Sequence, residues 1–168
     1  APLAPTPACG DADGPTVEQT EGPYFKRNSP ERASLREAGF AGTALVLTGT
    51  VASRSCRPLG RVLVELWHCD DAGNYDNVGM RGRAHQFTDP AGQYRFATVV
   101  PGLYPGRTRH FHFKFQAANR GVLTTQSYFP GEARNAADQL FDRRLLMQVS
   151  GTGAAERQAR FDVVLDIA

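Results

Sequence analysis

The chain has 168 residues, of which 41% are hydrophobic and 21% are charged, and its formal net charge is +2. This length supports one domain with a substantial core and is short for two domains. The small net charge and the scattered arginines argue against a nucleic-acid partner. No apolar run approaches the roughly 20 residues of a membrane-spanning helix, which argues against a membrane protein.

The first 23 residues are rich in Pro, Gly and Asp, which predicts an extended N-terminal arm ahead of a single domain over residues 24–168. The Pro- and Ala-rich lead-in is consistent with a leader removed during export. We therefore expect a secreted protein, although the sequence leaves a cytoplasmic location open.

The three cysteines, Cys9, Cys56 and Cys69, form no CxxC pair, which excludes a zinc ribbon. Cys69 follows a strand-like run and is predicted to be a small buried hydrophobic residue. Cys9 and Cys56 lie in polar, turn-like sequence, so in an oxidising compartment a disulfide between them could pin the arm to the domain. The sequence leaves open whether this bond forms.

Ser29 and Pro30 have the residue types of a helix N-cap and first turn, and they predict a short helix that ends before Gly39. A period of two then replaces this pattern. It predicts strands at residues 45–51, 61–67, 93–97, 110–116, 145–149 and 161–165. One or two helical turns are expected between residues 132 and 141.

Many short strands separated by Gly, Pro and Asp turns predict a mostly β fold. We expect an antiparallel β-sandwich with short helices and the extended N-terminal arm. The chain shows no βαβ alternation, no glycine-rich phosphate loop and no GxSxG elbow, which excludes the enzyme classes built on them.

Two histidines lie two residues apart in the predicted strand 110–116. His110 and His112 therefore face the same side of the sheet and could bind one metal ion as neighbouring ligands. The alternative is a strand that tolerates two histidines. Alone, the HxH pattern does not decide between these readings.

Two tyrosines in turn-like sequence, Tyr75 and Tyr104, strengthen the metal hypothesis. No cysteine or carboxylate pair accompanies the histidines, so the usual zinc ligand set is missing. Two phenolates and two imidazoles would suit a hard trivalent cation such as Fe(III), which would lower the phenol pKa from its ordinary value of about 10. Tyrosines that only form hydrogen bonds at a rim are the alternative.

The ordered motifs of the chain resemble those of the intradiol ring-cleavage dioxygenases, the non-haem iron(III) family that includes catechol 1,2-dioxygenases and protocatechuate 3,4-dioxygenases. The resemblance runs from about Glu18 to about Gln126 and is weaker towards the C-terminus. The matching segments are TEGPYF (20–25), VELWHCD (64–70), GNY (73–75), QFTD (86–89), GQYRF (92–96) and PGLYP (101–105), followed by Arg107, HFHF (110–113) and Gln126.

The resemblance implies a non-haem Fe(III) cofactor and the identity of its ligands. The implied metal ligands are Tyr75 and His110 in equatorial positions and Tyr104 and His112 in axial positions. Tyr104 would be the ligand that leaves when substrate binds, which also gives it a catalytic role.

The resemblance also implies a reaction, in which O₂ cleaves catechol-type aromatics to cis,cis-muconate-type diacids. Arg107 would stabilise negative charge on the bound catecholate, with Gln126 as a polar group beside it. Gly22 and Pro23 would line the substrate pocket together with Arg107. The implied partners are small-molecule catechols and O₂.

The chain departs from the family in lacking the long N-terminal helical segment through which catechol 1,2-dioxygenases dimerise, so its oligomeric state is not predicted. The stretch between Tyr104 and His110 is short, which implies an open pocket that accepts a range of small catechols. The sequence leaves open which catechol is preferred and whether it comes from a larger aromatic polymer.

Two alternatives remain at this stage. The first is a non-enzymatic, prealbumin-like β-sandwich binding module, because residues 88–96 with Pro101 and Gly102 resemble a turn of such modules. The second is a zinc or copper site built from all the histidines. We interpret the other histidines as lying behind the ligands or on the surface, Trp67 as a core or pocket-wall residue, and the remaining tyrosines as core or rim aromatics. These residues are His68, His85, Tyr24, Tyr94 and Tyr128.

Overall fold

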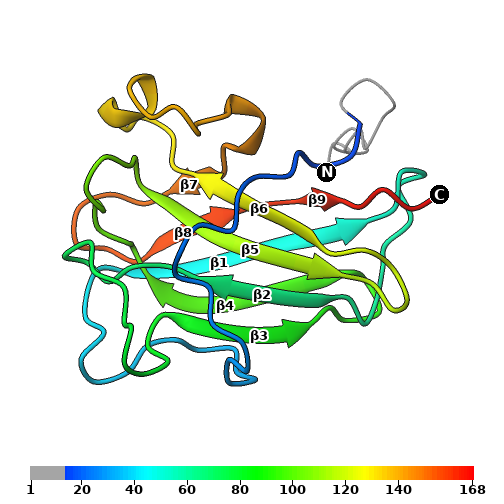
Figure 1. The fold of residues 1–168 in the computed structure, drawn as a ribbon, viewed down its shortest axis with the longest axis horizontal. Helices are drawn as coiled ribbons and strands as arrows, with labels where there is room; N and C mark the ends of the chain where they lie inside the picture. Colours follow the sequence, from blue (N-terminus) through cyan, green and yellow to red (C-terminus); the bar gives the residue numbers. More distant parts are fainter. Residues whose placement is uncertain (1–13) are drawn as a thin grey trace, which may run out of the picture.

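The computed structural model describes residues 14–168, which form two β-sheets packed face to face (Figure 1). The four-stranded sheet has the order β3-β2-β5-β6. Its strands are β2 (Leu63–Trp67), β3 (Arg83–Phe87), β5 (His110–Gln116) and β6 (Leu123–Tyr128).

The five-stranded sheet has the order β4-β1-β8-β7, and β9 also pairs with β1. Its strands are β1 (Ala44–Ala52), β4 (Gln93–Val99), β7 (Gln148–Ser150), β8 (Arg157–Arg160) and β9 (Val163–Val164). The predicted β-sandwich is confirmed, with one difference. The four-stranded sheet is antiparallel throughout, whereas β1 runs parallel to β8 and β9.

The hydrophobic core fills the space between the sheets. Phe111, Phe113 and Phe115 project into it from β5 and are fully buried. Val64 and Leu66 do the same from β2, as the period of two predicts. Since adjacent side chains of a strand point to opposite faces, the residues between these phenylalanines lie on the outer face of the four-stranded sheet.

Several predicted boundaries are wrong. The strand predicted at 61–67 begins only at Leu63, because Arg61 has a positive φ of 58°. The strand predicted at 145–149 begins at Gln148, since Arg143–Leu145 form a 3₁₀ helix, and that predicted at 161–165 shortens to Val163–Val164. The turn expected between 132 and 141 is the 3₁₀ helix Ala133–Ala136. Strands β3, β6 and β8 were not predicted.

The helix predicted from Ser29 is also wrong, because tertiary contacts hold this segment in an extended form. The amide of His85 donates to Pro30 O over 3.0 Å, and the amide of Leu35 donates to Ala97 O over 2.8 Å. The Ser29 hydroxyl does not cap a helix and donates to Glu65 Oε1 over 2.5 Å. The segment thereby covers strand edges of both sheets, which a helix could not do.

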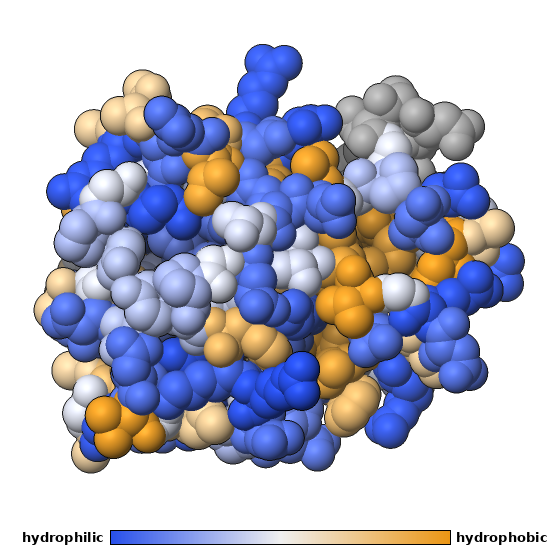
Figure 2. All heavy atoms as spheres, viewed as in Figure 1, coloured by the Kyte–Doolittle hydropathy of each residue, from blue (hydrophilic) through white to orange (hydrophobic). Residues whose placement is uncertain are grey.

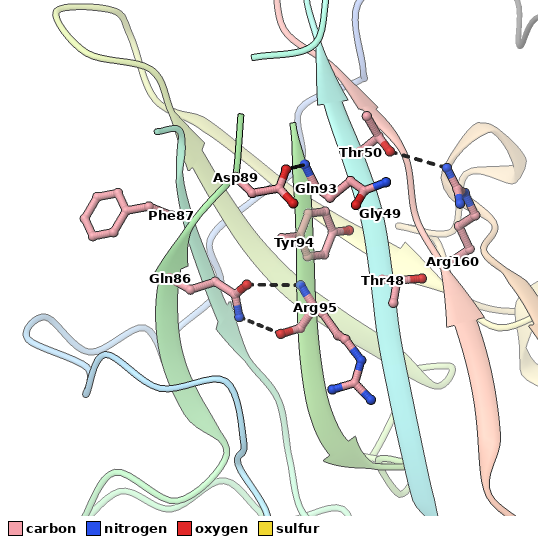
Figure 3. A pocket seen from close by; sticks show the side chains of 10 residues that line it. All are labelled: Thr48, Gly49, Thr50, Gln86, Phe87, Asp89, Gln93, Tyr94, Arg95 and Arg160. Carbon is pink, nitrogen blue, oxygen red and sulfur yellow. Dashed lines mark hydrogen bonds between the residues drawn. The ribbon is translucent and has the colours of Figure 1, made fainter. Parts of the chain in front are cut away.

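A side chain joins the two sheets where β3 and β4 lie next to each other. The Gln86 side-chain amide accepts from the backbone N–H of Arg95 over 3.0 Å and donates to Arg95 O over 2.7 Å. It thereby makes the pair of hydrogen bonds that the backbone of a neighbouring strand would make. Figure 3 shows both bonds in the shallow depression lined by β1, β3, β4 and β8. The Asp89 carboxylate accepts from the amides of Ala91 and Gln93 and fixes the turn into β4. The QFTD and GQYRF motifs are therefore explained by folding alone.

The N-terminal segment crosses the outer face of the four-stranded sheet, and Figure 1 shows it in blue in front of β6, β5 and β2. The backbone N–H of Gln19 donates to Thr124 O over 2.8 Å, and Lys114 Nζ lies 2.7 Å from Glu21 Oε1. Further along, the ring of Phe25 lies 4.9 Å from that of Trp67. The segment therefore shields one end of this face from solvent.

The surface of the described residues is mainly polar. Figure 2 shows hydrophilic residues over most of the face seen in Figure 1, with hydrophobic residues in small patches. The large hydrophobic residues that are clearly exposed are Val78, Val122, Leu140 and Leu146. Within residues 14–168, no helix has the length and hydrophobicity needed to span a bilayer.

The two cysteines among the described residues differ in whether they form a disulfide bond. Cys69 is free and buried, as predicted, and Cys56 is disulfide-bonded. Cys9 lies outside the described residues, so its pairing with Cys56 stays a prediction.

A thiol titration tests this pairing. If Cys9 and Cys56 are bonded to each other, the denatured, unreduced protein should expose one reactive thiol, that of Cys69, and all three thiols after reduction. Three reactive thiols before reduction would contradict the bond.

Candidate metal centre

The candidate site lies on the outer face of the four-stranded sheet, at the end where β5 begins. His110 and His112 alternate with the core phenylalanines and point to this outer face, yet both are buried. Their Nε2 atoms are 3.1 Å apart, so the two imidazoles converge on one point.

Tyr75 completes a tight group of three donor atoms. Its hydroxyl lies 3.3 Å from His110 Nε2 and 3.1 Å from His112 Nε2. Ligands that sit roughly 2.0–2.2 Å from one ion, at about right angles, are about 3 Å apart. The spacing of these three atoms therefore fits adjacent ligands of a single metal ion.

Hydrogen bonding and stacking orient the imidazoles. His110 Nδ1 donates to Thr108 O over 2.6 Å, which leaves its Nε2 lone pair free for a metal. His112 Nδ1 is buried and has no hydrogen-bond partner among the described residues. The His112 ring instead stacks on Trp67, at 5.0 Å between centroids and 9° between planes.

Burial sets the protonation states of these groups. It lowers the pKa of His110 to about 4, helped by the positive charge of Arg107, and lowers the pKa of His112 well below its ordinary value. Both imidazoles are therefore neutral at pH 7. Burial raises the pKa of the Tyr75 phenol, so its phenolate needs a nearby cation. This donor set thus favours a highly charged metal ion.

A glycine brings the two tyrosine-bearing loops together. Gly73 has a φ of +88°, and a Cβ there would lie 2.4 Å from Leu103 O, so only glycine permits this approach. The Asp70 carboxylate accepts from the amides of Ala72 and Asn74 and fixes the loop. The rings of Tyr75 and Tyr104 consequently meet edge to face, with centroids 5.7 Å apart.

Tyr104 lies in the site, but its hydroxyl bonds to a residue that the motif reasoning did not assign. The hydroxyls of Tyr104 and Tyr24 are 2.8 Å apart, and the Tyr24 ring stacks on Tyr75 at 4.4 Å and 18°. The sequence predicts a core or rim aromatic at Tyr24, whereas the structure places it against both tyrosines. Its position in the TEGPYF segment was the available signal.

A buried arginine connects the segments that carry these tyrosines. Arg83 donates from Nη1 to Tyr24 O and from Nη2 to Asp76 O, the latter over 3.1 Å. The side chain is almost fully buried and pairs across the strands with Trp67. Arg83 therefore ties Tyr24 and Tyr75 to the sheet, a role that the sequence reasoning missed.

Arg107 and Gln126 lie together, as the resemblance implied. Arg107 Nη2 donates to Gln126 Oε1 over 2.6 Å. Gln126 is the cross-strand partner of His112 and donates to Thr20 O over 3.1 Å. Arg107 Nε also donates to Asp138 Oδ2 over 2.8 Å, a contact that no motif indicated.

Gly22 lies directly over one imidazole. Its φ is +70°, and a Cβ there would lie 3.5 Å from His112 Cε1. Pro23 follows it and is exposed. This turn delivers Tyr24 to the site.

The other histidines stay apart from this group. His68 is buried, with Nε2 2.7 Å from Thr98 Oγ1 and Nδ1 2.7 Å from Cys69 O. His85 Nδ1 lies 3.0 Å from Ser29 Oγ. In the part of the chain that the structure describes, no three His, Cys, Asp or Glu side chains form a metal-binding group, so the zinc or copper site built from all histidines does not assemble.

Comparisons with known proteins agree with this geometry. A family model described as dioxygenase matches residues 20–167. The chain is 32% identical to the protocatechuate 3,4-dioxygenase beta chain of Burkholderia cepacia, over 74% of this chain and 65% of that protein. It is 31% identical to a hydroxyquinol 1,2-dioxygenase of Nocardioides simplex, over 81% of this chain and 52% of that protein.

A solved structure is more similar. It is the dioxygenase domain of a dioxygenase carbohydrate-binding protein fusion from the cellulolytic bacterium Streptomyces sp. SirexAA-E, with 52% identity and a TM-score of 0.88, covering 92% of this chain and all of that domain. The chain spans less than two thirds of the length of the curated relatives named above.

The buried His68 makes stability depend on pH. Burial lowers its pKa to about 3, whereas in the unfolded chain it titrates near 6.5. The unfolded state therefore binds the extra proton first, and the free energy of unfolding falls as the pH drops below about 6.5. Between about pH 7.5 and about pH 5 we expect His68 to contribute a loss of about 2 kcal/mol.

Urea unfolding of the metal-free protein and of His68→Gln at both pH values measures this contribution. The variant should lose less stability than the wild type on acidification. Equal losses would contradict the assignment of His68 as a buried neutral imidazole.

Proposed function

Because this chain belongs to the intradiol ring-cleavage dioxygenase family, we propose that it uses O₂ to cleave catechol-type aromatics between their two hydroxyl-bearing carbons. Both oxygen atoms enter the product, a cis,cis-muconate-type diacid. The observation that carries the proposal is the convergence of Tyr75 Oη, His110 Nε2 and His112 Nε2 within 3.3 Å of one another.

The donor atoms fit a non-haem Fe(III) ion. Two neutral imidazoles and two phenols would hold it, through Tyr75, Tyr104, His110 and His112, and the phenolates would offset its charge in a buried place. When bound, the iron would act as a Lewis acid that draws negative charge from a chelated catecholate.

Tyr104 is suited to be the exchangeable ligand and the proton acceptor. Its hydroxyl already bonds to Tyr24 and makes no hydrogen bond to the histidines, unlike that of Tyr75. A Tyr104 phenolate that gives way to substrate could take a proton from a catechol hydroxyl. The Tyr24 hydroxyl would then hold the resulting phenol in place.

Arg107 is suited to stabilise negative charge on the ring. Its guanidinium is permanently charged, and its side chain is largely buried, which strengthens its electrostatic effect. Nη2 is engaged by Gln126 and Nε by Asp138, whereas Nη1 makes no hydrogen bond within residues 14–168. That free nitrogen could face substrate, with Gly22 and Pro23 lining the opposite side.

We propose small substituted catechols as substrates. The relatives named above act, by their names, on protocatechuate and hydroxyquinol, which are catechols with one further ring substituent. Tyr104 and Arg107 are both partly exposed, which supports an open pocket. A non-enzymatic β-sandwich module would have no use for the buried phenol and imidazoles, so this alternative is not favoured.

An oxidising compartment would suit the protein. Cys56 is disulfide-bonded, and such bonds persist mainly in secreted proteins. This supports the proposal that the protein acts outside the cytoplasm.

Tyr75→Phe tests the metal centre. The iron-loaded wild type should show a visible tyrosinate-to-iron absorption band, and the variant should lose intensity, shift the band or bind iron more weakly, because one phenolate is gone. Absorption spectra and iron content measure these effects.

Tyr94→Phe is the matched control, since Tyr94 is a buried tyrosine that bonds to Phe161 O away from the site. It should keep the wild-type band. An unchanged band and unchanged turnover in Tyr75→Phe would contradict its assignment as a ligand.

A further inference from the structure

The segment between β6 and β7, yellow to orange in Figure 1, carries a buried carboxylate to the candidate site. The Asp138 side chain is 2% exposed, and Arg107 Nε donates to its Oδ2 over 2.8 Å. The Thr108 amide donates to the same oxygen over 2.8 Å, and the Leu140 amide donates to Oδ1 over 2.9 Å. Both carboxylate oxygens are therefore engaged.

We propose that Asp138 is a positioning residue, which holds the Arg107 guanidinium in the orientation needed to stabilise the substrate's negative charge. The proposal rests on the proposed function. Asp138 itself would touch neither substrate nor metal.

Two anchors fix the planar guanidinium. Asp138 accepts from Nε, and Gln126, which lies in β6, accepts from Nη2 over 2.6 Å. Because the five N–H groups of arginine form a rigid fork, two bonds at different nitrogens determine both its plane and its rotation. Nη1 then has a fixed direction. Without Asp138, the guanidinium bonds left within the described residues would be those from Nη2 to Gln126 and Tyr128, and the group could turn about them.

The charge of Asp138 matters as well as its shape. Arg107 and Asp138 form the most deeply buried ion pair among the described residues, and removal of one partner leaves the other charge uncompensated. An asparagine could accept through only one oxygen, and its NH₂ group would face an N–H donor at the other position. A neutral isostere therefore cannot reproduce the contacts.

The neighbouring contacts connect the same two segments. Thr108 Oγ1 donates to Asn135 Oδ1 over 2.5 Å, and Arg109 Nε lies 2.8 Å from Glu132 Oε1. Thr108 also supplies the carbonyl that accepts from His110 Nδ1. The segment thus holds the loop that leads to the proposed metal ligands, while Asp138 is the one carboxylate within residues 14–168 that pairs with Arg107.

Nuclear magnetic resonance of the metal-free protein tests the geometry without any turnover. The wild type should show a slowly exchanging arginine Nε–H signal that is absent in Arg107→Leu. In Asp138→Asn this proton should exchange at least about ten times faster, because a neutral amide oxygen is a weaker acceptor than the carboxylate and the NH₂ group beside it would face the Leu140 N–H. An Arg107 Nε–H that exchanges in the wild type as fast as an exposed arginine would overturn the proposal, even if the variant did not fold.

Steady-state kinetics of the iron-loaded protein test the consequence. Asp138→Asn should lower kcat about 10- to 100-fold, with a smaller change in KM, because misplacement of a charge-stabilising group raises the barrier. Added to Arg107→Leu, the same change should cost little more, since Asp138 acts through Arg107. Asp142→Asn, a more exposed carboxylate paired with Arg144, is the control and should keep wild-type kcat.

The outcomes separate the two proposals. Wild-type kcat in Asp138→Asn, or a full additional loss in the double variant, would overturn the positioning role while leaving the proposed function intact. A wild type that turns over no catechol would contradict the proposed function, and the Nε–H exchange rates would then decide the positioning role alone.

Discussion

The alternation of side chains along β5 places phenylalanines in the core and histidines on a covered outer face, and the candidate site depends on this arrangement. Phe111 and Phe113 are fully buried between the sheets and hold the strand in register. A slip of one residue would bury the imidazoles in the core. The opposite face would be open to water without the N-terminal segment, which brings Gly22 over His112 and the Tyr24 ring against Tyr75.

Burial on that face sets the protonation states with which the donor atoms would meet the proposed metal ion. The imidazoles are neutral there, and the Tyr75 phenol holds its proton more tightly than in water. Neither property stabilises the fold by itself. Both properties would favour binding of a trivalent ion, because neutral imidazoles can donate their lone pairs to it and its charge would stabilise the Tyr75 phenolate. This chemistry supports the proposed metal centre.

Local patterns predicted the elements in which hydrophobic and polar residue types alternate along the chain. Strand β5 matched its predicted range, because its alternation is strict. The sequence could not predict the extended form of residues 29–39, since hydrogen bonds to His85 and Ala97, far along the chain, determine it. In the site, the motif order indicated Tyr75, Arg107 and the histidines. Local patterns could not indicate Tyr24 and Asp138, because each depends on a partner far along the chain. Tyr24 bonds to Tyr104, 80 residues away, and Asp138 pairs with Arg107, 31 residues away.

The most direct test of the metal centre is the visible spectrum of the iron-loaded protein, recorded before and after addition of catechol without oxygen. The account predicts a broad tyrosinate-to-iron band that moves to longer wavelength when catechol binds, because the substrate enters an open site on Fe(III). A protein that takes up no iron, or that stays colourless with catechol, would contradict the convergence of these residues on a catalytic iron.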